Sequence, residues 1–206
     1  MPAEERREQL LRAALAVIVE RGFADTRIAD VAERAGTSPA LVIYYFKTRD
    51  ALLTEALRYS EDAWYAAGVK RLADIPTAAG QLTTLIAMTC LAEPDLPSSG
   101  WLLWLDLWAL SPRNPGVAAV RREFDERWRR AIAEIVTRGQ QRGEFAPGST
   151  PNSAPTSAED FTLTLSALLD GIAVQIALED PDFTPARAYD LAMAYAAERL
   201  GFVPPN

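Results

Sequence analysis

Helical periodicity is the feature that most constrains what this chain can fold into. In the first segment Leu11, Leu15 and Ile18 recur at the spacing of one face of an α-helix. No run that alternates with a period of two also carries the turn signals of a β-hairpin. Further helices are expected at residues 49–72, 77–92, 99–110, 117–142, 159–179 and 184–201. The sequence therefore predicts an all-α protein of about nine helices.

Glycines and cap residues divide the N-terminal part of the chain into three helices. Gly22 is expected as a left-handed C-cap of the first helix. Thr26 is expected to cap a second helix that ends at Gly36. Ser38 is expected to cap a third helix, with Pro39 at its first position, where the missing N–H of proline costs nothing.

The second and third of these helices have the arrangement of a helix-turn-helix motif, with glycine in the tight turn. In such a motif the second helix presents its N-terminal residues to base edges in the DNA major groove. Here that end is slim, and Tyr44, Tyr45 and Lys47 farther along can contact phosphate oxygens. The same spacing also occurs in helical proteins that do not bind DNA, where the tyrosines would be packing residues and the lysine a solvated charge.

The balance of charge differs between the two parts of the chain. The whole chain has 21 basic and 28 acidic residues, which by itself disfavours nucleic acid as a partner. Residues 1–50, however, carry eight of each sign, so the 13 basic and 20 acidic residues that follow hold all the excess negative charge. We therefore expect a neutral helix-turn-helix domain over residues 1–48 and an acidic domain over residues 49–206.

The residue inventory argues against an enzyme or a metal protein. The chain has no histidine, which removes Ser-His-Asp triads and almost every zinc site, and its single cysteine, Cys90, allows no intrachain disulfide. The N-terminus is too charged for a signal peptide, and the apolar stretch at 101–110 is broken by Asp106 and too short to span a bilayer. We expect a cytoplasmic protein with no catalytic residues, metal site, cofactor or membrane partner.

Four of the five tryptophans fall between residues 101 and 128. Three of them share one face of a helix that is apolar on its other side too, as a buried core helix would be. The alternative is that some of the rings line a ligand pocket, since such pockets are mostly apolar and aromatic. An aromatic cage beside a carboxylate would suit a cationic ligand. The candidate ligand-binding residues are Leu85, Met88, Thr89, Trp101, Trp104, Leu105, Trp108, Phe124 and Trp128.

The last two expected helices are the best candidates for a dimer interface. Residues 161–178 are apolar on more faces than one core contact requires, and Gly171 in mid-helix costs about 1 kcal/mol unless another helix approaches closely. The alternative is that both helices only complete the core of a monomer. The candidate dimer residues are Leu165, Leu168, Gly171, Ile172, Gln175, Leu191, Tyr195 and Leu200.

The stretch IADVAERAGTSPALVIYYFKTRDALL resembles the DNA-binding signature of the TetR family of bacterial repressors. The matching features are the Ile-Ala pair, Ala35-Gly36, Ser38, Tyr45-Phe46 and the entry into the fourth helix at residues 49–53. The resemblance covers about residues 8–55 and implies that nine residues fall at positions that touch DNA. They are Arg27, Thr37, Ser38, Pro39, Ala40, Tyr44, Tyr45, Lys47 and Arg49.

The third helix also departs from the pattern of that family. Family members often have Lys-Gly where this chain has Pro39-Ala40, and often have Tyr where it has Ile43. The lost lysine removes one phosphate or guanine contact. Base readout is therefore expected to depend more on apolar contacts to thymine methyl groups. The candidates for these contacts are Pro39, Ala40, Leu41 and Ile43.

The second part resembles the C-terminal regulatory domain of TetR-family members of the BetI type, whose namesake responds to choline. The matching elements are the Trp-x-x-x-Trp segment, the Asn-Pro turn at 114–115, Arg127-Trp128, the exit at 143–145, and Leu169-Asp170-Gly171 with Gln175. The Pro- and Ser-rich stretch 146–158 is expected to be an exposed, mobile loop longer than usual for that pattern. The resemblance implies a sensor of a small molecule.

We therefore interpret the chain as a homodimeric, ligand-responsive transcription factor, a repressor of the TetR type, rather than an enzyme. Its expected partners are a pseudo-palindromic double-stranded DNA operator, a second copy of the chain, and a small apolar, aromatic or cationic effector. The alternative is a helical small-molecule-binding protein without a DNA function. The sequence TSPALVIYYF favours the regulator.

Overall fold

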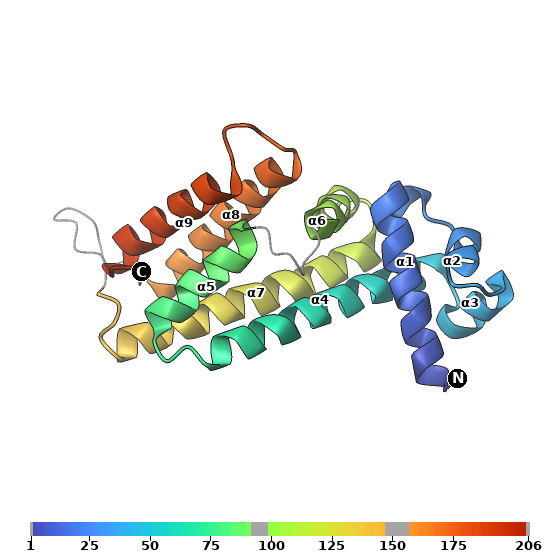
Figure 1. Cartoon of the computed structure of the whole chain (residues 1–206), viewed down its shortest axis with the longest axis horizontal. Coiled ribbons are helices and arrows are strands. Elements are labelled where there is room, and N and C mark those ends of the chain that lie inside the picture. The colour runs from blue at the N-terminus through green and yellow to red at the C-terminus, as the bar shows by residue number, and fades with distance from the viewer. Residues whose placement is uncertain (1, 92–98, 147–156, 205–206) are drawn as a thin grey trace. The chain divides into compact units, whose positions relative to one another are not determined.

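A computed structural model describes residues 2–91, 99–146 and 157–204 of the 206-residue chain (Figure 1). Within these ranges it contains nine α-helices and no strand, so the predicted all-α fold is confirmed. The helices are α1 (Ala3–Asp25), α2 (Ile28–Arg34), α3 (Pro39–Phe46), α4 (Arg49–Ala73), α5 (Ala78–Cys90), α6 (Ser99–Leu110), α7 (Pro115–Gln141), α8 (Ala158–Ala177) and α9 (Pro185–Leu200). Most of the stretch predicted as a mobile loop, 146–158, lies outside the described residues.

Local sequence signals set the starts of several helices. Ser38 caps α3 by accepting the N–H of Leu41 at 3.3 Å, and Pro39 takes the first helical position, as predicted. Thr77 and Thr184 cap α5 and α9 through their side-chain hydroxyls. Each of these bonds satisfies an N–H group that has no partner inside its own helix.

The end of α1 differs from the prediction. Gly22 has the expected positive φ, 79°, but a ψ of 160° that is not left-handed helical, and the chain then resumes one helical turn to Asp25. Thr26 does not cap α2, because it is fully buried and its hydroxyl donates to the carbonyl of Gly22 at 2.8 Å. Arg27 takes the cap position instead, with its N–H donating to Asp30 at 3.0 Å. The predicted cap at Thr26 was therefore wrong.

Contacts divide the chain into two compact units, each with its own core. The first unit comprises residues 2–66 and 99–124, and the described parts of the second are residues 67–91, 125–146 and 157–204. Helix α6 and the start of α7 thus belong to the same unit as the three N-terminal helices. The functional boundary near residue 48 stays a prediction.

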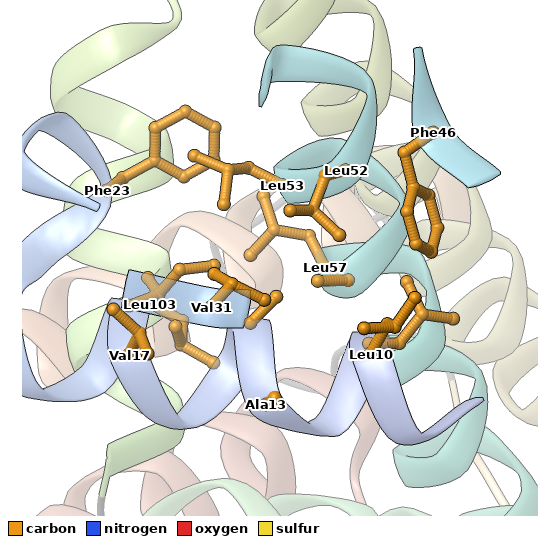
Figure 2. Close-up of a cluster of buried hydrophobic side chains, with 14 of the residues drawn as sticks. Leu10, Ala13, Val17, Phe23, Val31, Phe46, Leu52, Leu53, Leu57 and Leu103 are labelled. Carbon is orange, nitrogen blue, oxygen red and sulfur yellow. The ribbon is translucent and has the colours of Figure 1, made fainter. Parts of the chain in front are cut away.

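The core of the first unit joins α1, α2 and α3 to the first half of α4 and to α6 (Figure 2). Leu10 and Val17 of α1 and Phe46 of α3 are at most 3% exposed, as are Leu52 and Leu53 of α4. The short helices α2 and α3 depend on this core, because isolated helices of seven or eight residues are not stable in water.

The core of the second unit is formed by α5, α7, α8 and α9. Phe161 and Leu165 are fully buried, and the ring of Phe161 stacks on that of Tyr195 from α9 at a centroid distance of 5.9 Å. Ile132 and Val136 of α7 belong to the same apolar cluster. Among the described helices, only α8 is long and apolar enough to pass a length-and-composition test for a membrane span, which the core helix of a globular protein also passes.

Candidate nucleic-acid interface and ligand site

The turn between α2 and α3 is set by glycine and by backbone hydrogen bonds. Gly36 has a φ of 62°, a conformation that favours glycine. The N–H of Thr37 returns to the carbonyl of Ala32 at 2.9 Å, which closes the turn. Val42 and Phe46 then face the core, with exposed fractions of 0% and 3%. This anchoring leaves the opposite face of α3 in solvent.

The solvent face of α3 is formed by small and apolar side chains with one tyrosine. Pro39 and Ala40 are exposed at its N-terminal end, and Ile43 and Tyr44 follow one turn later with exposed fractions of 46% and 67%. Moving large apolar and aromatic side chains out of water lowers the free energy of the system. Their exposure here therefore indicates a surface that meets a partner.

The C-terminal end of α3 forms a sharp turn at Lys47. This residue has φ 64° and ψ −49°, and the N–H of Thr48 donates to the carbonyl of Phe46 at 2.7 Å, as in a γ-turn. The Lys47 ammonium donates to the carbonyl of Tyr44 at 2.9 Å and lies 5.3 Å from the centre of its ring. The lysine charge is therefore held beside the most exposed tyrosine of α3.

Arg49 braces the segment that joins α1 to α2. Its guanidinium donates to the carbonyls of Phe23, of Ala24 at 2.8 Å and of Thr26 at 2.6 Å, and it lies 5.7 Å from the centre of the Phe23 ring. These bonds account for most of its donors. A phosphate contact by Arg49 would compete with them, so the case for DNA binding rests on the other predicted residues.

Asp106 of α6 holds the same segment from another side. Its carboxylate accepts the N–H of Phe23 at 2.7 Å, and the nearer of its oxygens would lie 3.5 Å from a Cβ at Gly22. Asp106 is the only charged residue in α6. The last turn of α1, after the kink at Gly22, is therefore held jointly by α6 and by the first residue of α4.

A second polar link joins α1 to α4. The Tyr59 hydroxyl donates to Glu8 at 2.6 Å, and Arg12 donates to that hydroxyl at 3.0 Å and to Glu8 at 2.5 Å. The hydrogen bond from Tyr59 lowers the pKa of Glu8, and the bond to Tyr59 raises the pKa of Arg12. Burial is the main cause that raises the pKa of Tyr59. The network keeps its charges at neutral pH.

The predicted DNA-binding residues divide by exposure. The exposed ones are Arg27, Ser38, Pro39, Ala40, Tyr44 and Lys47. The half-buried ones are Thr37, Leu41, Tyr45 and Arg49. Tyr45 packs against the core of the first unit, which matches the packing role that remained open for it. Apart from Arg27, which caps α2, the exposed set lies on α3 or at its two caps.

Five of the predicted ligand-binding residues lie in the first unit. Trp104 is the centre of this group, with its ring 5.6 Å from that of Trp108 and 5.9 Å from that of Phe124. Its indole N–H donates to the carboxylate of Glu61 at 3.1 Å. Trp101 and Leu105 are half-buried on the same helix. Aromatic rings thus lie beside a carboxylate, but it belongs to Glu61 and not to Asp106.

The other four, Leu85, Met88, Thr89 and Trp128, lie in the second unit. The first three are buried, and the Thr89 hydroxyl donates to the carbonyl of Leu85 at 3.0 Å. Burial raises the pKa of the neighbouring Cys90 thiol to about 12, so this side chain is a neutral packing group at pH 7. Within the described part of the chain, α7 also carries an open surface groove beside Arg130, Glu134 and Arg138. None of the predicted ligand-binding residues lines it.

The predicted dimer residues also divide. Leu165, Ile172 and Leu200 are at most 3% exposed and pack inside the second unit, as the monomer-core alternative predicted. Gly171 and Leu191 are exposed, while Leu168, Gln175 and Tyr195 are half-buried. Periodicity could not separate the two sets, because α8 is apolar on both its inner and outer faces.

Two positioning residues were missed or misassigned from the sequence. Arg49 was predicted only as a DNA contact, and Asp106 was noted only as the charge that breaks an apolar stretch. The signal for Asp106 was present, since a lone acid in an otherwise apolar helix needs a specific partner. Its partner, the N–H of Phe23, lies 83 residues earlier in the chain and could not be inferred from local sequence.

A helix-turn-helix with a solvent-facing second helix, joined to a larger helical part, defines a class of DNA-binding regulators. Comparison with known proteins identifies the family. The family model of bacterial regulatory proteins, tetR family, matches residues 10–56, and that of the BetI-type transcriptional repressor, C-terminal, matches residues 79–201. The chain belongs to the TetR family of transcriptional regulators, with a BetI-type C-terminal domain.

Similar proteins span the whole chain. The HTH-type transcriptional regulator BetI of Serratia proteamaculans is 30% identical over 203 residues, covering 97% of this chain and 96% of its own. BetI of Burkholderia thailandensis is 30% identical over 193 residues, covering 93% and 92%. A transcriptional regulator from Saccharomonospora viridis, solved in complex with choline, superposes with a TM-score of 0.84 at 27% identity, covering 96% of this chain and 98% of its own.

Proposed function

We propose that this regulator is a cytoplasmic repressor that binds a pseudo-palindromic operator as a homodimer and leaves it when a small organic cation binds. The solvent face of α3 carries the proposal for DNA. Its N-terminal end is slim enough to enter a major groove, and Tyr44, Lys47 and Arg27 are exposed. These three can contact phosphates on either side of the groove.

Selection of bound duplexes from a random DNA pool tests this function. At about 0.15 M salt the non-specific attraction to phosphates is damped, so enrichment reports readout of sequence. We expect an inverted repeat whose half-sites lie about one helical turn apart. A folded dimer that enriches no sequence would favour a helical small-molecule-binding protein instead.

The outer face of α8 and α9 supports the homodimer. Leu163 and Gly171 lie eight residues apart on α8, Leu178 caps its C-terminal end, and both leucines are about half exposed or more. Leu191 of α9 is 46% exposed. Two copies of this surface would bury apolar area that one copy leaves in water.

The aromatic cluster around Trp104 supports a cationic ligand. Indole faces attract cations, and the carboxylate of Glu61 adds a negative charge at the edge of the cluster. The similar protein from Saccharomonospora viridis holds choline. We expect choline to weaken operator binding by a factor within the usual allosteric range of about 5 to 150. Operator affinity is measured while each compound is titrated. The alcohol 3,3-dimethylbutanol, which has the shape of choline but no charge, should leave operator binding unchanged.

Asp106 provides a route by which α6 can act on the helix-turn-helix. A ligand that shifts α6 would displace the carboxylate from the N–H of Phe23, in the last turn of α1. We therefore expect the Asp106→Ala variant to bind choline as the parent protein does, with binding measured by tryptophan fluorescence. Choline should, however, release this variant from the operator much less than it releases the parent protein. Unchanged release in this variant would exclude the route through Asp106.

A further inference from the structure

Helix α3 lacks the side chains that usually read bases through paired hydrogen bonds. Arg and Lys recognise guanine, Asn and Gln recognise adenine, and Asp and Glu recognise cytosine in the major groove. The α3 sequence, PALVIYYF, contains none of these six residue types. Paired hydrogen bonds from this helix to the edge of a base are therefore not available.

The polar groups at the two ends of α3 are already engaged within the protein. The Ser38 oxygen accepts the N–H of Leu41, which holds it at the start of the helix. The Lys47 ammonium is bonded to the carbonyl of Tyr44 and lies over its ring, at the C-terminal end of the helix. Both positions suit contacts with the DNA backbone better than contacts with base edges.

The remaining feature in the major groove is the C5-methyl group of thymine, which is the one apolar group that a base presents there. We infer that α3 reads thymine methyl groups and that Ile43 is the main specificity-determining residue; this inference rests on the proposed operator binding. Ile43 is 46% exposed, whereas Leu41 is partly covered and Val42 is fully buried.

The neighbours of Ile43 favour this role. Pro39 and Ala40 lie four and three residues before it, so the three side chains share one face of the helix. The small side chain of Ala40 allows the helix to approach the groove floor. The β-branched side chain of Ile43 has few rotamers in a helix and loses little conformational freedom on contact. The operator half-site should therefore carry thymine opposite this face.

Operators in which single thymines are replaced by deoxyuridine test the inference, because uracil lacks only the methyl group. The operator is the one enriched from the random pool, and dissociation constants are measured at fixed salt. We expect about fourfold weaker binding at each contacted thymine, the effect of leaving one methyl group unburied. Thymines outside the contact should show no change, and equal binding at every position would overturn the inference.

Two variants assign the effect to Ile43. Ile43→Ala should bind the thymine and deoxyuridine operators equally, because the apolar partner of the methyl group is gone. Tyr44→Phe, which loses only a hydroxyl, should weaken both operators alike and keep their ratio. Ile43 and Tyr44 lie on the surface, and circular dichroism will verify that both variants fold. A ratio unchanged in Ile43→Ala would assign the reading to another residue and overturn the inference.

The proposed function and the reading of thymine fail in different ways. If no sequence is enriched from the pool, operator binding itself is rejected. If an operator is enriched but tolerates deoxyuridine throughout, the repressor stands and the role of Ile43 is rejected.

Discussion

Replacing Gly171 by glutamate is expected to weaken operator binding by a factor of about 10² to 10⁴ while the protomer stays folded. When one copy of α3 in a dimer is bound to its half-site, the other copy is held beside the second half-site. The high effective concentration that results raises operator affinity by about 10² to 10⁴. Gly171 is exposed on α8, and a Cβ added there would have no atom within 4 Å in the protomer. A glutamate therefore fits the single chain, yet its side chain and charge would obstruct a second helix in close contact.

The change acts on the interface and not on the stability of the protomer. Glutamate has a higher helix propensity than glycine by about 0.5–1 kcal/mol, so α8 itself should gain. Analytical ultracentrifugation measures the oligomeric state, and fluorescence anisotropy measures operator affinity.

Gly171→Ala is the matched control for this experiment. It brings a gain in helix propensity at least as large, with a side chain of one methyl group. If Gly171 permits close helix contact, alanine should weaken the dimer modestly and glutamate should abolish it. A Gly171→Glu protein that remains a dimer with full operator affinity would place the interface elsewhere on the surface.

Those parts of the fold that depend on neighbouring residues could be predicted from the sequence. The cap at Ser38, the proline at the start of α3 and the glycine turn at Gly36 each arise from hydrogen bonds or backbone angles within a few residues. The recognition helix was identified for the same reason. Its anchoring side chains, Val42 and Phe46, lie four residues apart on the inner face.

Those parts that depend on distant residues could not be predicted. The turn at Phe23 is completed by Asp106 and Arg49, whose positions in space follow only from the assembled core. In α6, tryptophans and leucines surround the helix, so a periodicity of 3.6 residues cannot distinguish the buried Leu103 and Leu107 from half-buried rings. The same ambiguity placed buried residues of α8 among the predicted dimer contacts.

The second large effect is expected for Phe46→Ala, which should destabilise the first unit by about 3–5 kcal/mol. Phe46 is 3% exposed and belongs to the cluster that contains Leu52 and Leu57 of α4 (Figure 2). The guanidinium of Arg7 lies 5.3 Å from the centre of its ring. Alanine would leave a cavity at the last residue of α3 and remove that contact too.

The consequence for DNA binding should exceed the loss of stability, because α3 has few other anchors. An eight-residue helix does not persist alone, and without Phe46 only Val42 is a fully buried side chain of α3. Operator affinity should therefore fall at least tenfold at 25 °C, where circular dichroism still shows a folded protein. Thermal unfolding should begin at a lower temperature.

Phe161→Ala is the control that separates the two effects. Phe161 is fully buried in the core of the second unit, so its loss should cost a similar 3–5 kcal/mol without touching any residue that packs against α3. At 25 °C the folded, dimeric fraction of this variant should bind operator as well as the parent protein does. If operator affinity falls in both variants in proportion to the loss of unfolding free energy, the anchoring of α3 by Phe46 has no effect on DNA binding beyond its effect on stability. If only Phe46→Ala loses it, the position of the recognition helix depends on this one ring.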